Sequence, residues 1–223
     1  MNRPLSDEQY AALRQRMVDQ QLIARGIADP RVIDALSRVP RHLFVPEEMR
    51  AFAYEDHPLP LVANQTISQP YIVALMTQWA APEPTSRVLE IGFGSGYQTA
   101  VLAELAGHVW GIEIVESLAR SASQRLYDLG YHNVTLRHGD GYAGWPEHAP
   151  YDIILLAAAP PAIPPPLLEQ LARGGRLIAP VGVDEQFLTY IERDDDGQLH
   201  ERRLSRVLFV PMTGTAQRLP RTT

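Results

Sequence analysis

Glycines and acidic residues follow three of the β-prone segments in this 223-residue chain, in an arrangement that would suit the binding of a nucleoside. The first segment, Val88-Leu89-Glu90-Ile91, leads into the loop Gly92-Phe93-Gly94-Ser95-Gly96 and then into a helical pattern that starts at Tyr97. Glycines let the backbone approach a ligand closely and adopt positive φ values. Ligands of open α/β sheets lie beyond the carboxyl ends of the strands, where helix N-termini offer free N–H groups. We therefore predict that this loop binds a cofactor.

Two acidic residues fit the same interpretation. Glu113 ends the next β-prone run, and a carboxylate there can accept hydrogen bonds from both hydroxyls of a ribose. Asp140, which precedes Gly141 after the third run, can accept from an adenine amino group. Each also has a simpler explanation, since Glu113 could be a solvated surface acid and Asp140 a plain turn residue. Agreement among three successive strand ends favours the binding site.

A nicotinamide or flavin nucleotide is the competing ligand. Its fingerprint, G-x-G-x-x-G, would need a third glycine at position 97, where this chain has Tyr97. The third glycine comes one residue earlier, and Glu90, two residues before the first glycine, fits the pattern of S-adenosylmethionine-dependent methyltransferases better. We predict S-adenosylmethionine as the cofactor, bound by Glu90, Gly92, Gly94, Ser95, Gly96, Glu113, Asp140 and Gly141.

Alternating strands and helices must position these residues. The β-prone runs are 87–91, 109–114, 134–137, 151–156 and 176–181, and the helical patterns between several of them are 97–105, 115–129 and 165–172. This alternation implies βαβ units and an α/β fold with a doubly wound, mostly parallel sheet. Two further runs, 186–193 and 199–210, are joined by Asp-Asp-Asp-Gly and predict a C-terminal antiparallel hairpin.

Helices are predicted before the alternating region. Ser6 and Gln9 form a capping-box pattern for a helix over 6–25 that Gly26 ends. A second helix begins at Asp29-Pro30, with proline at its first position, and ends before Pro40. The stretch 40–70 has few periodic signals but many apolar residues, which favours an ordered, packed loop.

The organisation follows from these patterns as one domain in four parts. We predict an N-terminal helical and lid segment (1–80), a cofactor-binding core (81–182), C-terminal strands (183–217) and a short tail (218–223).

The composition excludes several classes of protein. Hydrophobic residues are 45% and charged residues 21% of the chain, as in ordinary globular proteins. The net charge of −6 and the lack of a basic stripe argue against nucleic-acid binding. The chain has no cysteine and its seven histidines lack ligand spacing, so no metal site is predicted. No apolar run reaches the roughly 18 residues of a membrane span, and the N-terminus lacks a signal peptide's apolar region. We expect a cytoplasmic monomer that binds no membrane.

Segments from about residue 14 to 212 resemble the protein-L-isoaspartate O-methyltransferase family. The Gln65-Thr66-Ile67-Ser68 segment is specific to that family, whereas the glycine loop is shared by many methyltransferases. The other matching segments are Val39-Pro40-Arg41-His42-Leu43-Phe44-Val45-Pro46, Asn133-Val134, His138-Gly139-Asp140-Gly141, Ala158-Ala159-Pro160-Pro161, Pro180-Val181-Gly182 and Phe209-Val210-Pro211.

The resemblance implies the class I S-adenosylmethionine methyltransferase fold and an enzyme that methylates the free carboxylate of isoaspartyl residues in aged proteins. The ester then collapses to a succinimide, which reopens partly to normal aspartate. The resemblance also implies that Ser68 lies beside the reacting carboxylate as the catalytic residue, although a serine there could instead cap the loop. The substrate-binding residues implied are Gln65, Thr66, Ile67 and Ser68. Because a carboxylate is already ionised at neutral pH, no strong general base is required.

Several positions depart from the family pattern. Val62 and Asn64 replace glycines, Phe93 replaces a threonine, Ala157 a hydroxyl residue and Leu208 an arginine. Loss of a hydroxyl and of a cation would weaken recognition of an anionic peptide. Two alternatives therefore stay open, a paralogous methyltransferase with another substrate and a cofactor-binding protein with vestigial catalysis.

Overall fold

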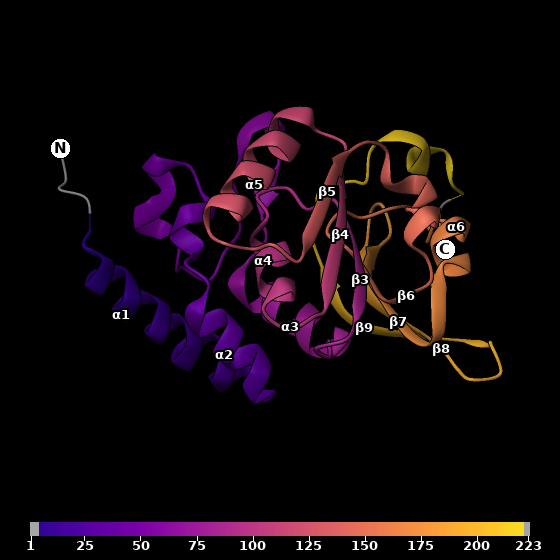
Figure 1. The fold of residues 1–223 in the computed structure, drawn as a ribbon, viewed down its shortest axis with the longest axis horizontal. Coiled ribbons are helices and arrows are strands. Elements are labelled where there is room, and N and C mark those ends of the chain that lie inside the picture. Colours follow the sequence, from indigo (N-terminus) through magenta and orange to yellow (C-terminus); the bar gives the residue numbers. More distant parts are fainter. Residues whose placement is uncertain (1–4, 221–223) are drawn as a thin grey trace.

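A computed structural model describes residues 5–220, with a seven-stranded sheet at its centre (Figure 1). The strand order is β5-β4-β3-β6-β7-β8-β9, in which the first five strands are parallel and the last two antiparallel. The strands are β3 (Arg87–Ile91), β4 (His108–Glu113), β5 (Val134–His138), β6 (Tyr151–Leu156), β7 (Leu171–Val181), β8 (Gln186–Arg193) and β9 (Leu199–Val207). The predicted doubly wound sheet and the C-terminal hairpin are confirmed. The order in which strands are added reverses at β3: β4 and β5 follow on one side of it, and β6 then pairs with its other side.

Helices cover both faces of the sheet because its strands alternate apolar side chains between them. Val88 faces α3 and α4 on one side, whereas Leu89 faces α6 on the other. Strands buried on both faces read as nearly continuous apolar runs, as they do here. The helices around the sheet are α3 (Pro70–Ala80), α4 (Tyr97–Ala103), α5 (Glu116–Asp128) and α6 (Pro165–Glu169).

Two of these elements differ from the predictions. Helix α3 was not predicted, because its sequence is apolar on nearly all sides and Gln69 at its N-cap provides no side-chain hydrogen bond. The helix predicted over 165–172 is too long, since α6 ends at Glu169 and β7 already begins at Leu171. β9 likewise ends at Val207, so the following residues are not part of the hairpin.

The N-terminal helices follow the predicted capping signals. Helix α1 (Asp7–Met17) has the capping box in which the Ser6 hydroxyl accepts from the Gln9 N–H and the Gln9 side chain accepts in return. It continues through a π-helical turn and a 3₁₀ turn to Gly26, whose φ of 91° ends it. Helix α2 (Pro30–Arg38) begins with the predicted cap at Asp29.

The segment between α2 and α3 is ordered and packed, as predicted. It forms three 3₁₀ turns, Arg41–Phe44, Glu47–Phe52 and Val62–Asn64. Strands β1 (Leu59–Pro60) and β2 (Thr66–Ile67) pair antiparallel next to the last turn. Its buried apolar side chains join the same core as α1 and α2, so the segment is held by packing as well as by its own hydrogen bonds.

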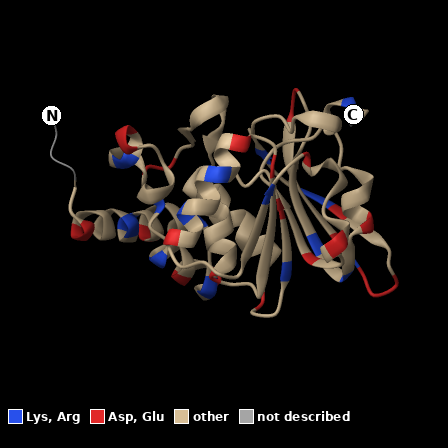
Figure 2. Cartoon of the chain, turned by 45° about the horizontal axis from the view of Figure 1, so that its top comes forward, with Lys and Arg blue, Asp and Glu red and all other residues tan. Residues whose placement is uncertain are grey.

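The surface carries both signs of charge. Acidic and basic residues are interspersed over helices and strands, and acidic residues occupy the turn between β8 and β9 (Figure 2). Within residues 5–220, no helix combines the length and the apolar character needed to cross a membrane. A 3₁₀ turn at Gly214–Arg218 follows the sheet, and Leu219 packs against the core, whereas residues 221–223 of the predicted tail lie outside the described part.

Candidate active site

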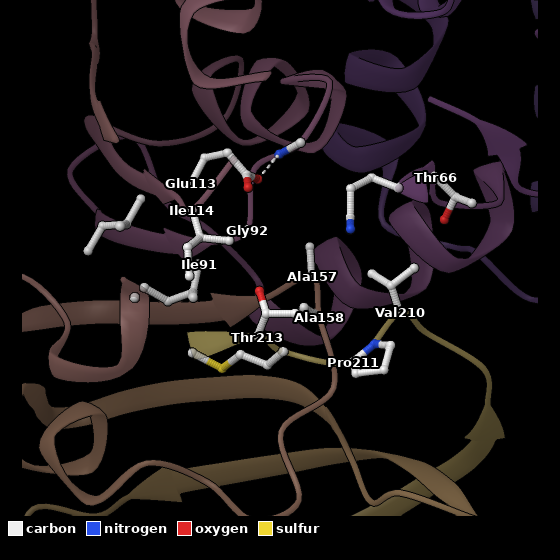
Figure 3. Close-up of a pocket in the computed structure, with 15 residues that line it drawn as sticks. Thr66, Ile91, Gly92, Glu113, Ile114, Ala157, Ala158, Val210, Pro211 and Thr213 are labelled. Atoms are coloured by element: carbon white, nitrogen blue, oxygen red, sulfur yellow. Dashed lines mark hydrogen bonds between the residues drawn. The ribbon is translucent and has the colours of Figure 1, made fainter. Parts of the chain in front are cut away.

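The carboxyl ends of β3, β4 and β6 surround a cavity at the point where the strand order reverses (Figure 3). Doubly wound sheets bind their ligands at this switch point. Residues 65–66, before the sheet in the sequence, and residues 210–213, after it, complete the wall. The lining residues are Gln65, Thr66, Ile91, Gly92, Gly94, Ile112, Glu113, Ile114, Gly141, Ala157, Ala158, Val210, Pro211, Met212 and Thr213.

The glycine loop between β3 and α4 has the left-handed backbone that its sequence predicts. Gly92, Gly94 and Gly96 have φ values of 81°, 51° and 84°. A Cβ on Gly96 would lie 3.1 Å from the Leu126 side chain, so this position also lets α5 pack closely. The loop's path therefore depends on residues that tolerate positive φ and lack side chains.

Glu113, at the end of β4, connects the glycine loop to the start of the segment that follows β4. Its side chain is buried, and its carboxylate accepts from the Gly94 N–H (Figure 3) and from the Val115 N–H, both at 2.8 Å. An ionised carboxylate offers about four lone-pair positions, so two remain for other donors. The residues present thus fit a nucleoside whose ribose hydroxyls donate to Glu113.

Glu90 lies inside the core and does not line the cavity. One of its carboxylate oxygens accepts from the Thr99 hydroxyl of α4 at 2.6 Å, and the other has no partner within residues 5–220. Complete burial raises the pKa of Glu90 to about 8, against the opposing effect of the Thr99 hydrogen bond. Burial thus favours the protonated form of this side chain, which fastens β3 to α4 behind the glycine loop.

Asp140 points to the C-terminal segment. Its carboxylate accepts from the Tyr142 N–H and from the N–H and hydroxyl of Thr215. Partial burial would raise the pKa of Asp140, but the hydrogen bonds from Thr215 and Tyr142 outweigh it and hold the pKa below its usual value. The adjacent Gly141 does line the cavity, and a Cβ on it would lie 2.4 Å from the Ile91 side chain.

The structure therefore divides the residues predicted to bind the cofactor into two groups. Gly92, Gly94, Glu113 and Gly141 line the cavity. The four others, Glu90, Ser95, Gly96 and Asp140, surround it without lining it. Ser95 accepts from the Tyr97 N–H at 3.3 Å, so its hydroxyl stabilises the start of α4.

A second cavity of about 680 Å³ adjoins the first, and we call it the substrate cleft because Ser68, which is predicted to bind the substrate, lines it. The two cavities share Thr66, Ala157 and Val210 in their walls. Ser68 lines the substrate cleft, and its hydroxyl has no hydrogen-bond partner within residues 5–220. This excludes the loop-capping alternative for the Ser68 side chain among the described residues.

The other residues of the family-specific segment take different positions. Gln65 and Thr66 line the first cavity, Thr66 near Val210 (Figure 3). Ile67 is buried, pairs with Leu59 in the small β1–β2 sheet and lines neither cavity. The structure thus places Ile67 in the core rather than on the substrate surface, because side chains of a strand alternate between its two faces.

The positions that depart from the family pattern are spread over distinct environments. Phe93 packs against Ala119 and Ala122 of α5 and does not enter the cavity. Ala157 lines both cavities, and Leu208 is 91% exposed beside the substrate cleft. The left-handed residues of the loop before Gln65 are Ala63 and Asn64, with φ of 57° and 55°, so Val62 is not strained.

Sequence reasoning missed the C-terminal wall of the first cavity. Pro211, Met212 and Thr213 follow the hairpin and line this cavity, and Pro211 and Thr213 lie beside Ala158 (Figure 3). A backbone bridge joins Ala159 to Pro211. The matching segment Phe209-Val210-Pro211 carried the signal for this contact, but nothing in its residue types indicates what it would pack against.

Comparison with known proteins points to one family. The model of the protein-L-isoaspartate(D-aspartate) O-methyltransferase family matches residues 13–217. A Synechococcus protein-L-isoaspartate O-methyltransferase is 60% identical over 80% of this chain and 73% of its own length. A second relative, protein-L-isoaspartate O-methyltransferase 2 of Syntrophobacter fumaroxidans, is 50% identical over 94% of this chain and 89% of its own.

Solved structures are similar as well. A protein-L-isoaspartate O-methyltransferase structure superposes with a TM-score of 0.82 at 29% identity, covering 91% of this chain and 67% of that one. A Plasmodium falciparum protein with the same proposed activity, in complex with S-adenosyl-L-homocysteine, gives a TM-score of 0.78 at 27% identity. That match covers 92% of this chain and 98% of the other. The predicted methyltransferase fold is thereby confirmed.

Proposed function

The chain belongs to the protein-L-isoaspartate(D-aspartate) O-methyltransferase family, and from this we propose how its two adjoining cavities divide the reaction. It is an S-adenosylmethionine-dependent enzyme that methylates the free carboxylate of isoaspartyl residues in damaged proteins. The cavity at the strand ends takes the methyl donor, and the substrate cleft takes the isoaspartyl residue. Their shared wall is where the two reactants meet.

The reaction asks for alignment rather than for proton transfer. S-adenosylmethionine supplies a methyl group bound to a positively charged sulfur. A carboxylate oxygen of the isoaspartyl residue forms the new bond to carbon as the sulfur–carbon bond breaks, and no proton moves. Because the carboxylate is ionised at neutral pH, the enzyme's task is to hold the reacting atoms in line and to keep water away.

Ser68 is the residue that we assign to holding the carboxylate. Ser68 lines the substrate cleft two positions after Thr66 of the shared wall, and its hydroxyl is unpaired among the described residues. A hydrogen bond from this hydroxyl to one carboxylate oxygen leaves the other oxygen free to attack. Thr66 and Gln65 line the neighbouring surface and would contact the substrate backbone. The unpaired hydroxyl beside a shared wall is the observation that carries this assignment.

The cofactor roles follow from the strand ends. Glu113 accepts from the ribose hydroxyls while it keeps its bonds to Gly94 and Val115. Gly141 leaves room for the nucleoside, and Asp140 next to it accepts from the adenine amino group at a lone pair beyond the three hydrogen bonds that it already receives. The remaining glycines set the shape of the loop.

Paired peptides that differ only in Asp or isoAsp test the activity and the role of Ser68. With labelled S-adenosylmethionine, transfer is expected to the isoAsp peptide alone. Ser68→Ala should lower kcat by roughly tenfold, about the value of one hydrogen bond to a charged group, with an unchanged dissociation constant for S-adenosylhomocysteine. Ser205→Ala, which alters a β9 residue on the same cleft, is the matched control and should keep near-normal turnover.

Other outcomes would favour the alternatives. Equal transfer to both peptides would indicate a paralogue with another substrate, and cofactor binding without transfer would indicate vestigial catalysis. Unchanged turnover in Ser68→Ala would remove Ser68 from the site. We also propose that the chain acts as a monomeric, single-domain cytoplasmic enzyme independent of nucleic acid and membrane, and a dimer in size-exclusion chromatography would contradict the first of these expectations.

A further inference from the structure

Arg41 is a fully buried cation that has no carboxylate partner among the ion pairs of residues 5–220. Its Nε donates to the Ala53 carbonyl and its Nη2 to the Ser68 carbonyl, both at 2.7 Å. Burial of a charge costs free energy that an apolar side chain of similar volume would avoid. The burial of this cation therefore indicates a role beyond filling the core.

The two carbonyls belong to different turns of the segment between α2 and α3. Ala53 follows the 3₁₀ turn Glu47–Phe52, and Ser68 is the residue that lines the substrate cleft. A guanidinium presents its donors in a rigid planar fork, so two acceptors bound to it are fixed in distance and orientation. A second tie joins the same two turns, since the Gln69 side chain donates to the Asp56 carbonyl at 2.9 Å.

Arg41 also contacts the cofactor half of the site. Its guanidinium carbon lies 4.8 Å from the centre of the Tyr97 ring, within the range of a cation–π interaction. Tyr97 is buried and is the first residue of α4, directly after the glycine loop. One side chain thus contacts the start of the helix behind the cofactor and the backbone of the proposed substrate-binding serine.

We propose that Arg41 is a positioning residue that sets the Ser68 backbone relative to the start of α4 and so aligns the substrate carboxylate with the methyl donor. The inference rests on the proposed role of Ser68. In-line transfer is sensitive to such alignment, because a displacement of about 1 Å can cost roughly 100-fold in rate. Arg41 itself touches neither reactant, so its effect passes through Ser68.

The test compares Arg41→Met and Arg41→Lys with Arg14→Met. Arg14 is a matched control because it also donates to a distant carbonyl, that of Ser37, and to the Tyr54 hydroxyl, yet it has no contact with Ser68. For Arg41→Met we expect kcat/KM on the isoAsp peptide to fall by about 100-fold, with S-adenosylhomocysteine affinity within threefold of the starting protein. Arg41→Lys should recover part of kcat because an ammonium can reach one carbonyl but not hold both in a fork. Arg14→Met should keep normal kcat.

Hydrogen exchange gives a readout that does not depend on activity. Amides in 65–72 should exchange faster in Arg41→Lys than in Arg14→Met, and because the lysine variant keeps the charge, it serves if Arg41→Met fails to fold. Unchanged exchange in 65–72, or kcat/KM equal to that of the starting protein, would overturn the inference, as would an equal loss in Arg14→Met. If Ser68→Ala is fully active while the exchange still rises, the role of Ser68 fails but its tie to Arg41 stands.

Discussion

The two halves of the site are held together in different ways. The cofactor half is built where strands end, and its contacts join the loops that follow neighbouring strands, as in the bond from the Gly94 N–H to Glu113 at the end of β4. The substrate half is built from short turns that the side chains of Gln21, Arg41 and Gln69 fasten to backbone carbonyls of other turns. Pairing of the strands fixes the positions of the strand ends. Each side-chain hydrogen bond to a turn, in contrast, depends on one particular residue. The substrate half should therefore be the one that substitution can loosen without harm to the sheet.

The largest expected effect comes from breaking the cofactor half at Glu113. Glu113→Ala leaves the Gly94 and Val115 N–H groups without their acceptor and removes the proposed ribose contact. Hydrogen bonds to charged groups are worth about 1.5–3 kcal/mol each, so cofactor affinity should fall by at least 100-fold. Isothermal titration with S-adenosylhomocysteine measures it. Glu116→Ala alters an exposed acid at the start of α5 and is the control.

Glu113→Ala should leave the substrate half of the site intact. Hydrogen exchange in 53–69 should stay close to that of the unaltered protein, because the ties of that segment do not pass through β4. Faster exchange there would show that the two halves are coupled, contrary to their separate construction. Undiminished affinity for S-adenosylhomocysteine would exclude Glu113 from the ribose site.

A smaller effect is expected from two glycines in the same turn. Gly141→Ala would place its Cβ 2.4 Å from Ile91, whereas Gly139→Ala would meet only the Ile112 side chain at 3.9 Å. Overpacking costs about 1–3 kcal/mol, so Gly141→Ala should lose stability and roughly tenfold or more in cofactor affinity. Gly139→Ala should change both very little. Equal behaviour of the two variants in urea unfolding and titration would contradict the close contact with Ile91.

The same contrast explains what the sequence could predict. The glycine loop, Glu113 and the parallel strands could be predicted because each is marked by a short run of neighbouring residues. Helix α3 is apolar on nearly all sides, so no periodicity marked it. The bond from Arg41 to Ser68 spans 27 positions and depends on the packing of several turns, and no residue type announces such a partner. The family-specific motif predicts a role for Ser68 but not which side chain holds its backbone.

Glu90 illustrates a further limit, since its residue type and position suggested a ligand contact. The packing of α4 on β3 instead encloses it completely, and Thr99 accounts for one of its oxygens. Sequence order gives the distance of an acid from a glycine loop, but it does not say whether the side chain points along the loop or into the core.

Of the substitutions considered, one at Glu90 should affect cofactor binding least. Its effect should appear instead in the pH dependence of the unfolding free energy. Burial raises the folded-state pKa of Glu90 to about 8, above the ordinary value of 4.5 expected for an unfolded chain. Between these two pH values the folded protein keeps a proton that the unfolded chain loses. Stability from this group is therefore fully present below about pH 4.5 and falls as the pH rises toward 8.

Glu90→Gln removes this dependence because an amide does not titrate, and its oxygen can still accept from Thr99. The difference in unfolding free energy between the variant and the unaltered protein should move in favour of the variant by up to about 1.4 kcal/mol per pH unit across that range. Urea unfolding at pH 5, 6.5 and 8 measures it, and taking the difference cancels groups that titrate alike in both proteins. A difference that stays constant with pH would mean that Glu90 is ionised in the folded state. The glycine loop would then lie against a buried negative charge. The stability of the cofactor half would depend on electrostatic interactions with that charge as well as on the geometry of the strand ends.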